Sequence, residues 1–129
     1  MKKKIILFGD VNSFISTLLI RVFLQNLDSR FELIAIVNTT SREIRNTKSF
    51  FIFLVKKIFN PFDKNLRMMK NDSYLDFINK KIIIDSENIN DEKFVKQIRN
   101  LSPDYAFLMG CPQIFKKDLI VSFKKVINY

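Results

Sequence analysis

The chain has 129 residues, enough for one domain with a hydrophobic core, and its 47% hydrophobic content excludes an intrinsically disordered protein. The net charge of +9 favours an anionic partner or substrate, and the single cysteine excludes an intrachain disulfide. With no histidine and only scattered acids, no metal-ligand cluster is expected. The apolar run after the basic start is too short for a signal peptide or a membrane span, so we expect a cytoplasmic protein.

The amino-terminal third predicts a strand, a helix and a second strand. An apolar run follows the initial lysines, and residues 9–13 form the turn after it, in which Asn12 or Ser13 can cap the helix. Apolar residues then recur at helical spacing to about Leu27, and a second buried strand is predicted at 33–37. A strand–helix–strand unit of this length indicates a parallel pair with a right-handed crossover.

The turn after the first strand has two interpretations. Backbone N–H groups at the start of a helix attract anions, so the turn could hold a phosphate group of a substrate. A lone Gly9 falls far short of the Gly-x-Gly-x-x-Gly motif that binds dinucleotide phosphates. An ordinary strand–helix turn is therefore the simpler interpretation of these residues.

The segment 39–70 is strongly basic and rich in phenylalanine. It carries eight basic residues and two acidic ones, and its centre, 50–59, is apolar apart from two lysines; Pro61 ends this stretch. The simplest interpretation is a helix that packs on the sheet and keeps its lysines in water. Two alternatives are a surface for RNA such as tRNA, and an interfacial helix that contacts a membrane surface. Charge runs alone do not decide among the three.

The next stretch predicts two helices with a strand between them. Residues 71–73 can cap a short helix at 74–80, and 81–85 form a third strand. Asn90 is expected to cap a longer helix, whose first turn holds two acids at the positive end of the helix dipole. The Ser-Pro pair at 102–103 ends that helix, because proline cannot continue it.

The carboxyl-terminal quarter predicts a strand, a loop, a helix and another strand. Tyr105 to Met109 is a continuous apolar run of strand length, and Gly110 ends it. Apolar residues at 114–123 recur at near-helical spacing, and a final strand begins at Val126. Alternating strands and helices predict a doubly wound, Rossmann-like α/β domain with a mainly parallel sheet and helices on both faces. In such sheets, ligands bind at the carboxyl ends of the strands.

A set of short motifs carries a resemblance to a known family: Pro103-Asp104, Gly110, Gln113-Ile114, Lys117-Asp118-Leu119 and Val126-Ile127-Asn128. In this order they resemble the amino-terminal domain of the folate-dependent formyltransferases, which act on glycinamide ribonucleotide, methionyl-tRNA and amino sugars. In that family the last strand leads into an Asn-x-His motif. Asn128 and Tyr129 match its first two positions, and the chain ends where the histidine would stand. We therefore expect 1–129 to be one such domain, incomplete at its carboxyl end, with 39–70 as an insertion.

The resemblance implies a site for 10-formyltetrahydrofolate, the formyl donor, and for an amine substrate such as an amino sugar, a nucleotide sugar or an aminoacyl-tRNA. Asn128 would donate a hydrogen bond to the oxyanion that develops as the amine attacks the formyl group. The pteridine-like ring of the donor would pair with main-chain groups of the loop after the preceding strand, although Pro112 lacks an N–H. Part of the substrate would lie near Gly9, Asp10 and Asn12. The residues implied in donor binding are Met109, Gly110, Cys111, Pro112, Gln113, Ile114 and Phe115.

Formyl transfer also needs a group that moves protons near neutral pH, and histidine is the usual one. Because the chain has none, we expect it to be inactive by itself, as a truncated member of the family. Two alternatives stay open at this stage. One is a non-catalytic nucleotide- or folate-binding module, and the other is a basic protein that binds RNA or a membrane surface through 39–70.

Overall fold

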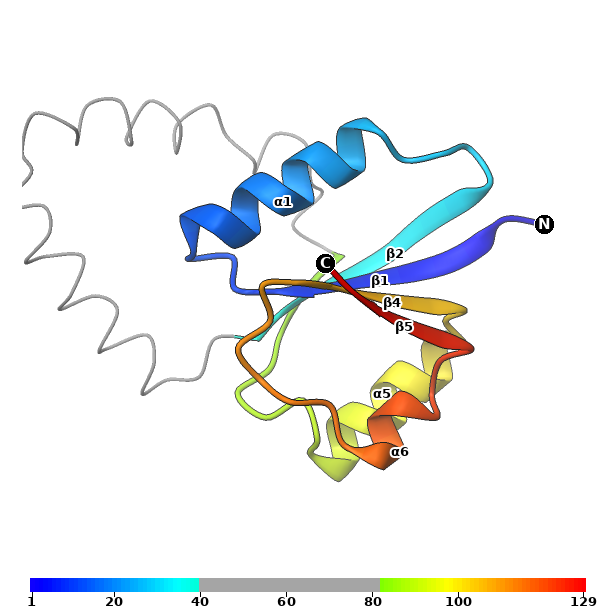
Figure 1. Cartoon of the computed structure of the whole chain (residues 1–129). Helices are drawn as coiled ribbons and strands as arrows, with labels where there is room; N and C mark the ends of the chain where they lie inside the picture. The colour runs from blue at the N-terminus through cyan, green and yellow to red at the C-terminus, as the bar shows by residue number, and fades with distance from the viewer. Residues whose placement is uncertain (40–81) are drawn as a thin grey trace, which may run out of the picture.

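The computed structural model describes residues 1–39 and 82–129, which form a five-stranded sheet whose neighbouring strands are all parallel (Figure 1). The strands lie in the order β3-β2-β1-β4-β5, with α1 on one face and α5 and α6 on the other. This arrangement confirms the predicted Rossmann-like α/β class. The elements are β1 (Lys3–Gly9), α1 (Phe14–Gln25), β2 (Phe31–Asn38), β3 (Ile83–Asp85), α5 (Glu92–Leu101), β4 (Tyr105–Met109), α6 (Lys117–Ile120) and β5 (Lys125–Asn128).

The central strand β1 separates two hydrophobic cores, because successive side chains of a strand point to opposite faces. Ile5 and Leu7 pack toward α1, and Ile6 and Phe8 pack toward α5 and α6; all four are fully buried. Burying an aliphatic or aromatic side chain contributes about 1.5–3 kcal/mol each, so this strand anchors both layers. The uninterrupted apolar run that predicted a buried parallel strand is thereby explained.

The start of helix α1 is fixed by its N-cap residue, Ser13. Ser13 has extended backbone angles, and its Oγ accepts a hydrogen bond from the Ser16 N–H, so Ser13 rather than Asn12 is the cap. The helix ends at Gln25, two residues before the predicted end near Leu27, because the Asn26 side chain donates to the Val22 carbonyl. Strand β2 is longer than predicted, since β1 pairs with it from Phe31 onward.

The predicted cap of the second described helix, α5, was wrong by one residue. Asp91, not Asn90, caps this helix by accepting a hydrogen bond from the Lys93 N–H at 3.2 Å. Asn90 instead reaches the loop after β4, as described below. The helix ends as predicted before Pro103, and Ser102 adopts the left-handed conformation with φ of 49° that ends many helices.

The helix expected within 114–123 is a single turn, α6. Apolar spacing in this stretch reflects inward-pointing residues of a loop rather than one face of a helix. Phe115 and Phe123 both contact Phe8, with ring centroids 4.7 and 5.9 Å away, while Ile114 between β4 and α6 is 84% exposed. The Phe115 and Phe123 ring centroids lie 6.4 Å apart, whereas eight residues of a continuous helix would separate them by about 12 Å.

Residues 40–81 fall outside the described ranges, so the predicted helix at 74–80, the basic segment beyond Thr39 and its apolar centre at 50–59 stay predictions. Of the predicted third strand, β3 retains Ile83–Asp85. In the two ranges that the structure does describe, no helix has the length and apolar character to cross a membrane.

Candidate functional site

The carboxyl ends of the central strands meet at one rim of the sheet. Gly9 of β1 pairs with Met109 of β4, and Leu108 of β4 pairs with Asn128 of β5. The Tyr129 N–H continues this register by donating to the Leu108 carbonyl at 3.0 Å. The chain leaves β1 and β4 toward opposite faces, so the topological switch point, where ligands bind in open α/β sheets, lies between these two strands.

Two glycines let the turn after β1 and the loop after β4 approach closely at the switch point. A Cβ on Gly110 would lie 2.6 Å from the Ser16 Oγ, and Gly110 has a φ of 68°, which other residues rarely adopt. The Ser16 hydroxyl donates to the Gly110 carbonyl at 3.2 Å and so joins α1 to this loop. A Cβ on Gly9 would meet the Met109 carbonyl at 2.8 Å. Any side chain at either glycine would push the two segments apart.

The side chain of Gln113 ties the loop after β4 to the ends of β2 and β3. Its Nε2 donates to the Thr39 carbonyl at 2.6 Å and lies 3.4 Å from the Ser86 carbonyl, and its Oε1 accepts from the Ile89 N–H at 3.0 Å. Sequence reasoning assigned Gln113 to ligand binding through its main chain and missed this structural role of its side chain. No local signal reveals it, because the three partners lie 24 to 74 residues away in the chain.

A second amide fixes the same loop from the other side. Asn90 donates from its Nδ2 to the Ile114 carbonyl and accepts the Lys116 N–H at its Oδ1, both at 2.8 Å. Among the described residues, the backbone N–H groups of Ile114 and Phe115 have no hydrogen-bond partner. The loop therefore holds two consecutive free donors on a frame that two side-chain amides keep in place.

The thiol of Cys111 is a structural group in this arrangement. Burial raises its pKa, and hydrogen bonds from the Gln113 backbone and the Thr39 side chain only partly oppose that effect. The Sγ itself donates to the Gln113 carbonyl at 3.3 Å. A thiol with a raised pKa stays protonated at neutral pH and is a poor nucleophile. Cys111 therefore offers main-chain groups to the site, not covalent chemistry.

A chain of polar side chains crosses the ends of β1, β2 and β3. The Asp10 carboxylate is fully buried and accepts the Asn12 N–H at 2.9 Å, while Asn38 accepts the Val11 N–H at 3.3 Å and donates to Asp85 at 2.7 Å. Asn38 and Asp85 were not singled out from the sequence; their only signal was a polar residue at the end of an apolar strand. The Asp10 carboxylate occupies one N–H that a phosphate in this turn would need, which favours the structural interpretation of the turn.

Asn128 lies at the exposed end of β5, and its predicted neighbour Gly110 follows the adjacent strand β4, so the two emerge side by side. The register pairs Asn128 with Leu108, which packs toward α5 and α6, and this places the amide on that face. In the described ranges, no three His, Cys, Asp or Glu side chains gather as a metal site would require.

No protein-family description matches the chain, and no curated protein is detectably similar to it. The formyltransferase resemblance consequently depends on the motif residues alone. Of these, Gly110, Gln113 and Asn128 lie at this rim of the sheet, whereas Asp104 lies at the opposite rim.

Proposed function

We propose that the loop 110–115 binds the pteridine-like ring of a tetrahydrofolate, and that the domain serves formyl transfer from 10-formyltetrahydrofolate to an amine. The observation that supports this proposal is the pair of consecutive free N–H groups at Ile114 and Phe115 on an anchored loop at the switch-point rim. A flat heterocycle with alternating donors and acceptors along one edge is the kind of ligand that consecutive main-chain groups recognise.

The anchoring of the loop matters for affinity. A loop that must be ordered on binding reduces the affinity by the entropy lost, whereas Gln113 and Asn90 already hold this loop in one conformation. Main-chain recognition also tolerates Cys111 and Pro112 at positions where the side chain would otherwise matter, although Pro112 contributes no N–H. The exposed Ile114 and half-buried Phe115 supply apolar surface for the ring.

The chemical step would use the end of β5. As the amine nitrogen attacks the formyl carbon, negative charge develops on the formyl oxygen, and the carbon–nitrogen bond to the folate then breaks with its electron pair returning to the folate nitrogen. The amine loses a proton, and the folate nitrogen gains one. We assign Asn128 to donate a hydrogen bond to the oxyanion, an interaction whose removal typically lowers turnover by about 10²–10³-fold.

The composition predicts that these 129 residues bind the donor without transferring the formyl group. No histidine is present to move the proton. Formyl-transfer assays with an amino sugar, a nucleotide sugar and methionyl-tRNA as acceptors should show no turnover. Transfer to any of these acceptors would contradict this prediction.

Binding is tested by titration calorimetry with 5-formyltetrahydrofolate, a stable analogue of the donor. Ile114→Pro removes one free N–H without removing an internal hydrogen bond of the described residues, and the matched control Ile114→Ala keeps that N–H. We expect Ile114→Pro to weaken binding about tenfold relative to Ile114→Ala, the effect of one hydrogen bond. Thermal unfolding of both variants checks that the loop anchors survive the change.

Two results would overturn the proposal: absence of folate binding by the unaltered chain, or equal affinity of the two Ile114 variants. Titration with nucleotides in parallel distinguishes the rival binding module. Nucleotide binding that is lost on altering Asn12, without folate binding, would favour that module and the phosphate interpretation of the turn after β1.

A further inference from the structure

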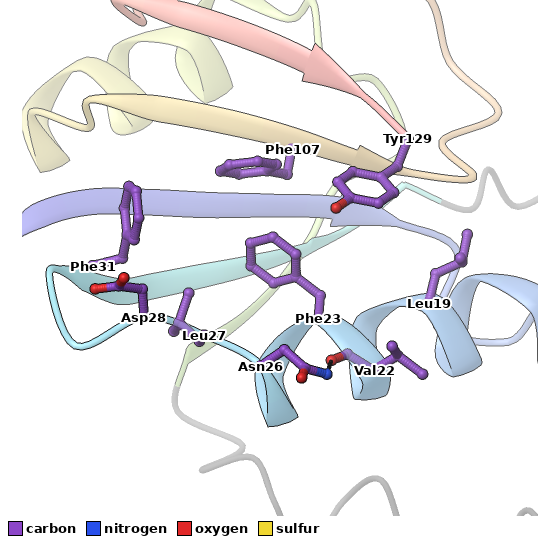
Figure 2. A pocket seen from close by; sticks show the side chains of 9 residues that line it. All are labelled: Leu19, Val22, Phe23, Asn26, Leu27, Asp28, Phe31, Phe107 and Tyr129. Carbon is purple, nitrogen blue, oxygen red and sulfur yellow. Dashed lines mark hydrogen bonds between the residues drawn. The ribbon is translucent and has the colours of Figure 1, made fainter.

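An aromatic groove lies between α1 and the β4–β5 side of the sheet, on the face opposite α5 and α6 (Figure 2). Its volume is about 390 Å³, within the range of small-molecule sites. Phe23 and Phe107 are in contact in the groove, with ring centroids 4.8 Å apart. Tyr129 lies at the end where β5 finishes, and Phe31 at the end where β2 starts. Four of the described lining residues are therefore aromatic, and flat rings stack against such a lining.

Two exposed lysines lie on the same face of the sheet, at the end of the groove where the strands start. Lys3 pairs with Phe31 in the register of β1 and β2. Lys125 pairs with Tyr105 in the register of β4 and β5. Register partners of neighbouring strands point to the same face, and Phe31 and Tyr105 both belong to the cluster under α1. The Lys3 Nζ accordingly lies 5.5 Å from the centre of the Tyr105 ring.

The positive charge of these two lysines is available to a ligand. In the ranges that the structure describes, neither Lys3 nor Lys125 forms an ion pair. Asp28 is the one acid among the described lining residues, and Arg30 holds both of its oxygens at 3.0 and 2.9 Å. An anionic group can therefore approach the lysines without meeting an unpaired carboxylate of the groove lining.

A ligand that suits these features carries a flat ring and, close to it, a negative charge. The rings of the groove offer stacking surface, and lysine is a common ligand for phosphate. The Tyr129 hydroxyl has no hydrogen-bond partner among the described residues, so it can bond to the polar edge of a ring. Lys2 and Lys4, both exposed, extend the positive charge along the start of β1, where further phosphates of a strand would lie.

We propose that the groove binds one nucleotide of a single-stranded nucleic acid, with its base on the ring of Phe107 and its phosphate between Lys3 and Lys125. Strands β1 and β5 flank β4, so the two lysines start about 10 Å apart across the sheet, and their flexible side chains can converge on one phosphate. Aromatic rings beside cations are how proteins bind single strands without reading their sequence. This inference does not depend on the proposed folate site, and its surface is separate from the basic segment 39–70.

Fluorescence anisotropy with a labelled single-stranded RNA of about eight nucleotides tests the stacking. Phe107→Leu keeps an apolar side chain but removes the flat ring, and it should weaken binding about tenfold. Phe14→Leu is the matched control, because it makes the same change at a partly exposed position of α1 that does not line the groove. Its affinity should equal that of the unaltered chain. Thermal unfolding confirms that both variants are folded.

The salt dependence of the same binding tests the phosphate contact. Lys125→Gln should weaken binding and lower the slope of log affinity against log salt by about 0.7, the value for one phosphate contact to a single strand. Lys96→Gln removes an equal charge at an exposed position of α5, on the opposite face, and should leave that slope unchanged. The pair of variants separates a local contact from the general attraction of a chain with net charge +9.

Four results would overturn the proposal. They are absence of RNA binding, equal affinity of the Phe107→Leu and Phe14→Leu variants, an unchanged salt slope in Lys125→Gln, and binding of uridine monophosphate as tight as that of the RNA. The last result would replace the strand by a free nucleotide. Titration of Phe107→Leu with 5-formyltetrahydrofolate keeps the two proposals apart, because its affinity for that compound should equal that of the unaltered chain.

Discussion

The two faces of the sheet bury their aromatic residues to different extents. On the face of α5 and α6, Phe8 is fully buried among Phe94, Phe115 and Phe123, whose rings meet it edge to face. On the face of α1, Phe107 is only half-buried and Tyr129 is 69% exposed. The first cluster is closed by the described residues themselves, and the second leaves the rings of Phe107 and Tyr129 partly open to solvent beside Phe23 (Figure 2). The comparison teaches that the two faces of one sheet can differ in how completely they are packed.

Removing the central ring of each cluster should give the largest contrast. Phe8→Ala leaves a cavity in a fully buried cluster and should lower the free energy of unfolding by about 3–5 kcal/mol. Phe107→Ala, on the half-open face, should cost less than half as much, because its ring already contacts solvent. Urea denaturation of both variants measures the two losses. Equal losses would show that the face of α1 is as tightly packed as the other.

The strands and helices were easier to predict from the sequence than the contacts at the rim, for a physical reason. Apolar runs and helical spacing are local properties, so they indicated β1, α1, β2, α5 and β4 together with the faces that these elements bury. The hydrogen bonds at the rim are not local: Gln113 bonds to Thr39, 74 residues away in the sequence, and Ser16 to Gly110, 94 residues away. Which polar side chain anchors a loop depends on a register that only the folded sheet establishes.

The same reasoning explains why the sequence pattern overestimated the length of the helix around α6. The spacing of Phe115 and Phe123 is compatible with a helix, yet both rings pack on Phe8 and only one helical turn, α6, lies between them. Tertiary packing overrode the local pattern there. Of the candidate site, the meeting of Gly110 and Asn128 at one rim was predictable from the parallel order of strands, whereas the anchoring amides of Asn90 and Gln113 were not.

Gln113→Ala should have an intermediate effect on the free energy of unfolding. It separates the contribution of a loop anchor from that of core packing. The substitution removes little apolar area, but it leaves the Ile89 N–H and the Thr39 carbonyl without the partner that they have now. Leaving buried polar groups unpaired costs about 1–3 kcal/mol, so we expect a loss in that range from thermal or urea unfolding. Gln97→Ala on the exposed side of α5 provides a matched control and should change stability by less than about 0.5 kcal/mol.

Hydrogen exchange locates the effect of the same variant. The Ile89 N–H, which loses its acceptor, should exchange faster in Gln113→Ala, while the N–H groups of α1 on the other face should be unaffected. Faster exchange throughout the sheet would mean that Gln113 supports the whole core rather than one loop. An unchanged rate at the Lys116 N–H, which Asn90 accepts, would mean that Asn90 alone is sufficient to hold the loop.

The smallest expected effect on stability lies at the opposite rim, where Asp104 joins the starts of β1, β4 and β5. The hydrogen bond from the Lys124 side chain, and then the one from the Lys4 N–H at 2.8 Å, hold the pKa of the Asp104 carboxyl below its ordinary value. A carboxyl with a lowered folded pKa stabilises the fold above its unfolded pKa, about 3.9, and that contribution is lost as the pH falls through the folded value.

Asp104→Asn should therefore reduce stability at neutral pH, and the difference from the unaltered chain should shrink as the pH falls below about 4. Urea denaturation at a series of pH values measures this difference. A gap that persists at low pH would assign the role of Asp104 to shape rather than charge. Asp104 lies at the strand starts, away from the ring of Phe107, so the pH-dependent stability difference should be the same in a Phe107→Ala background. A different value there would mean that Phe107 and Asp104 are energetically coupled.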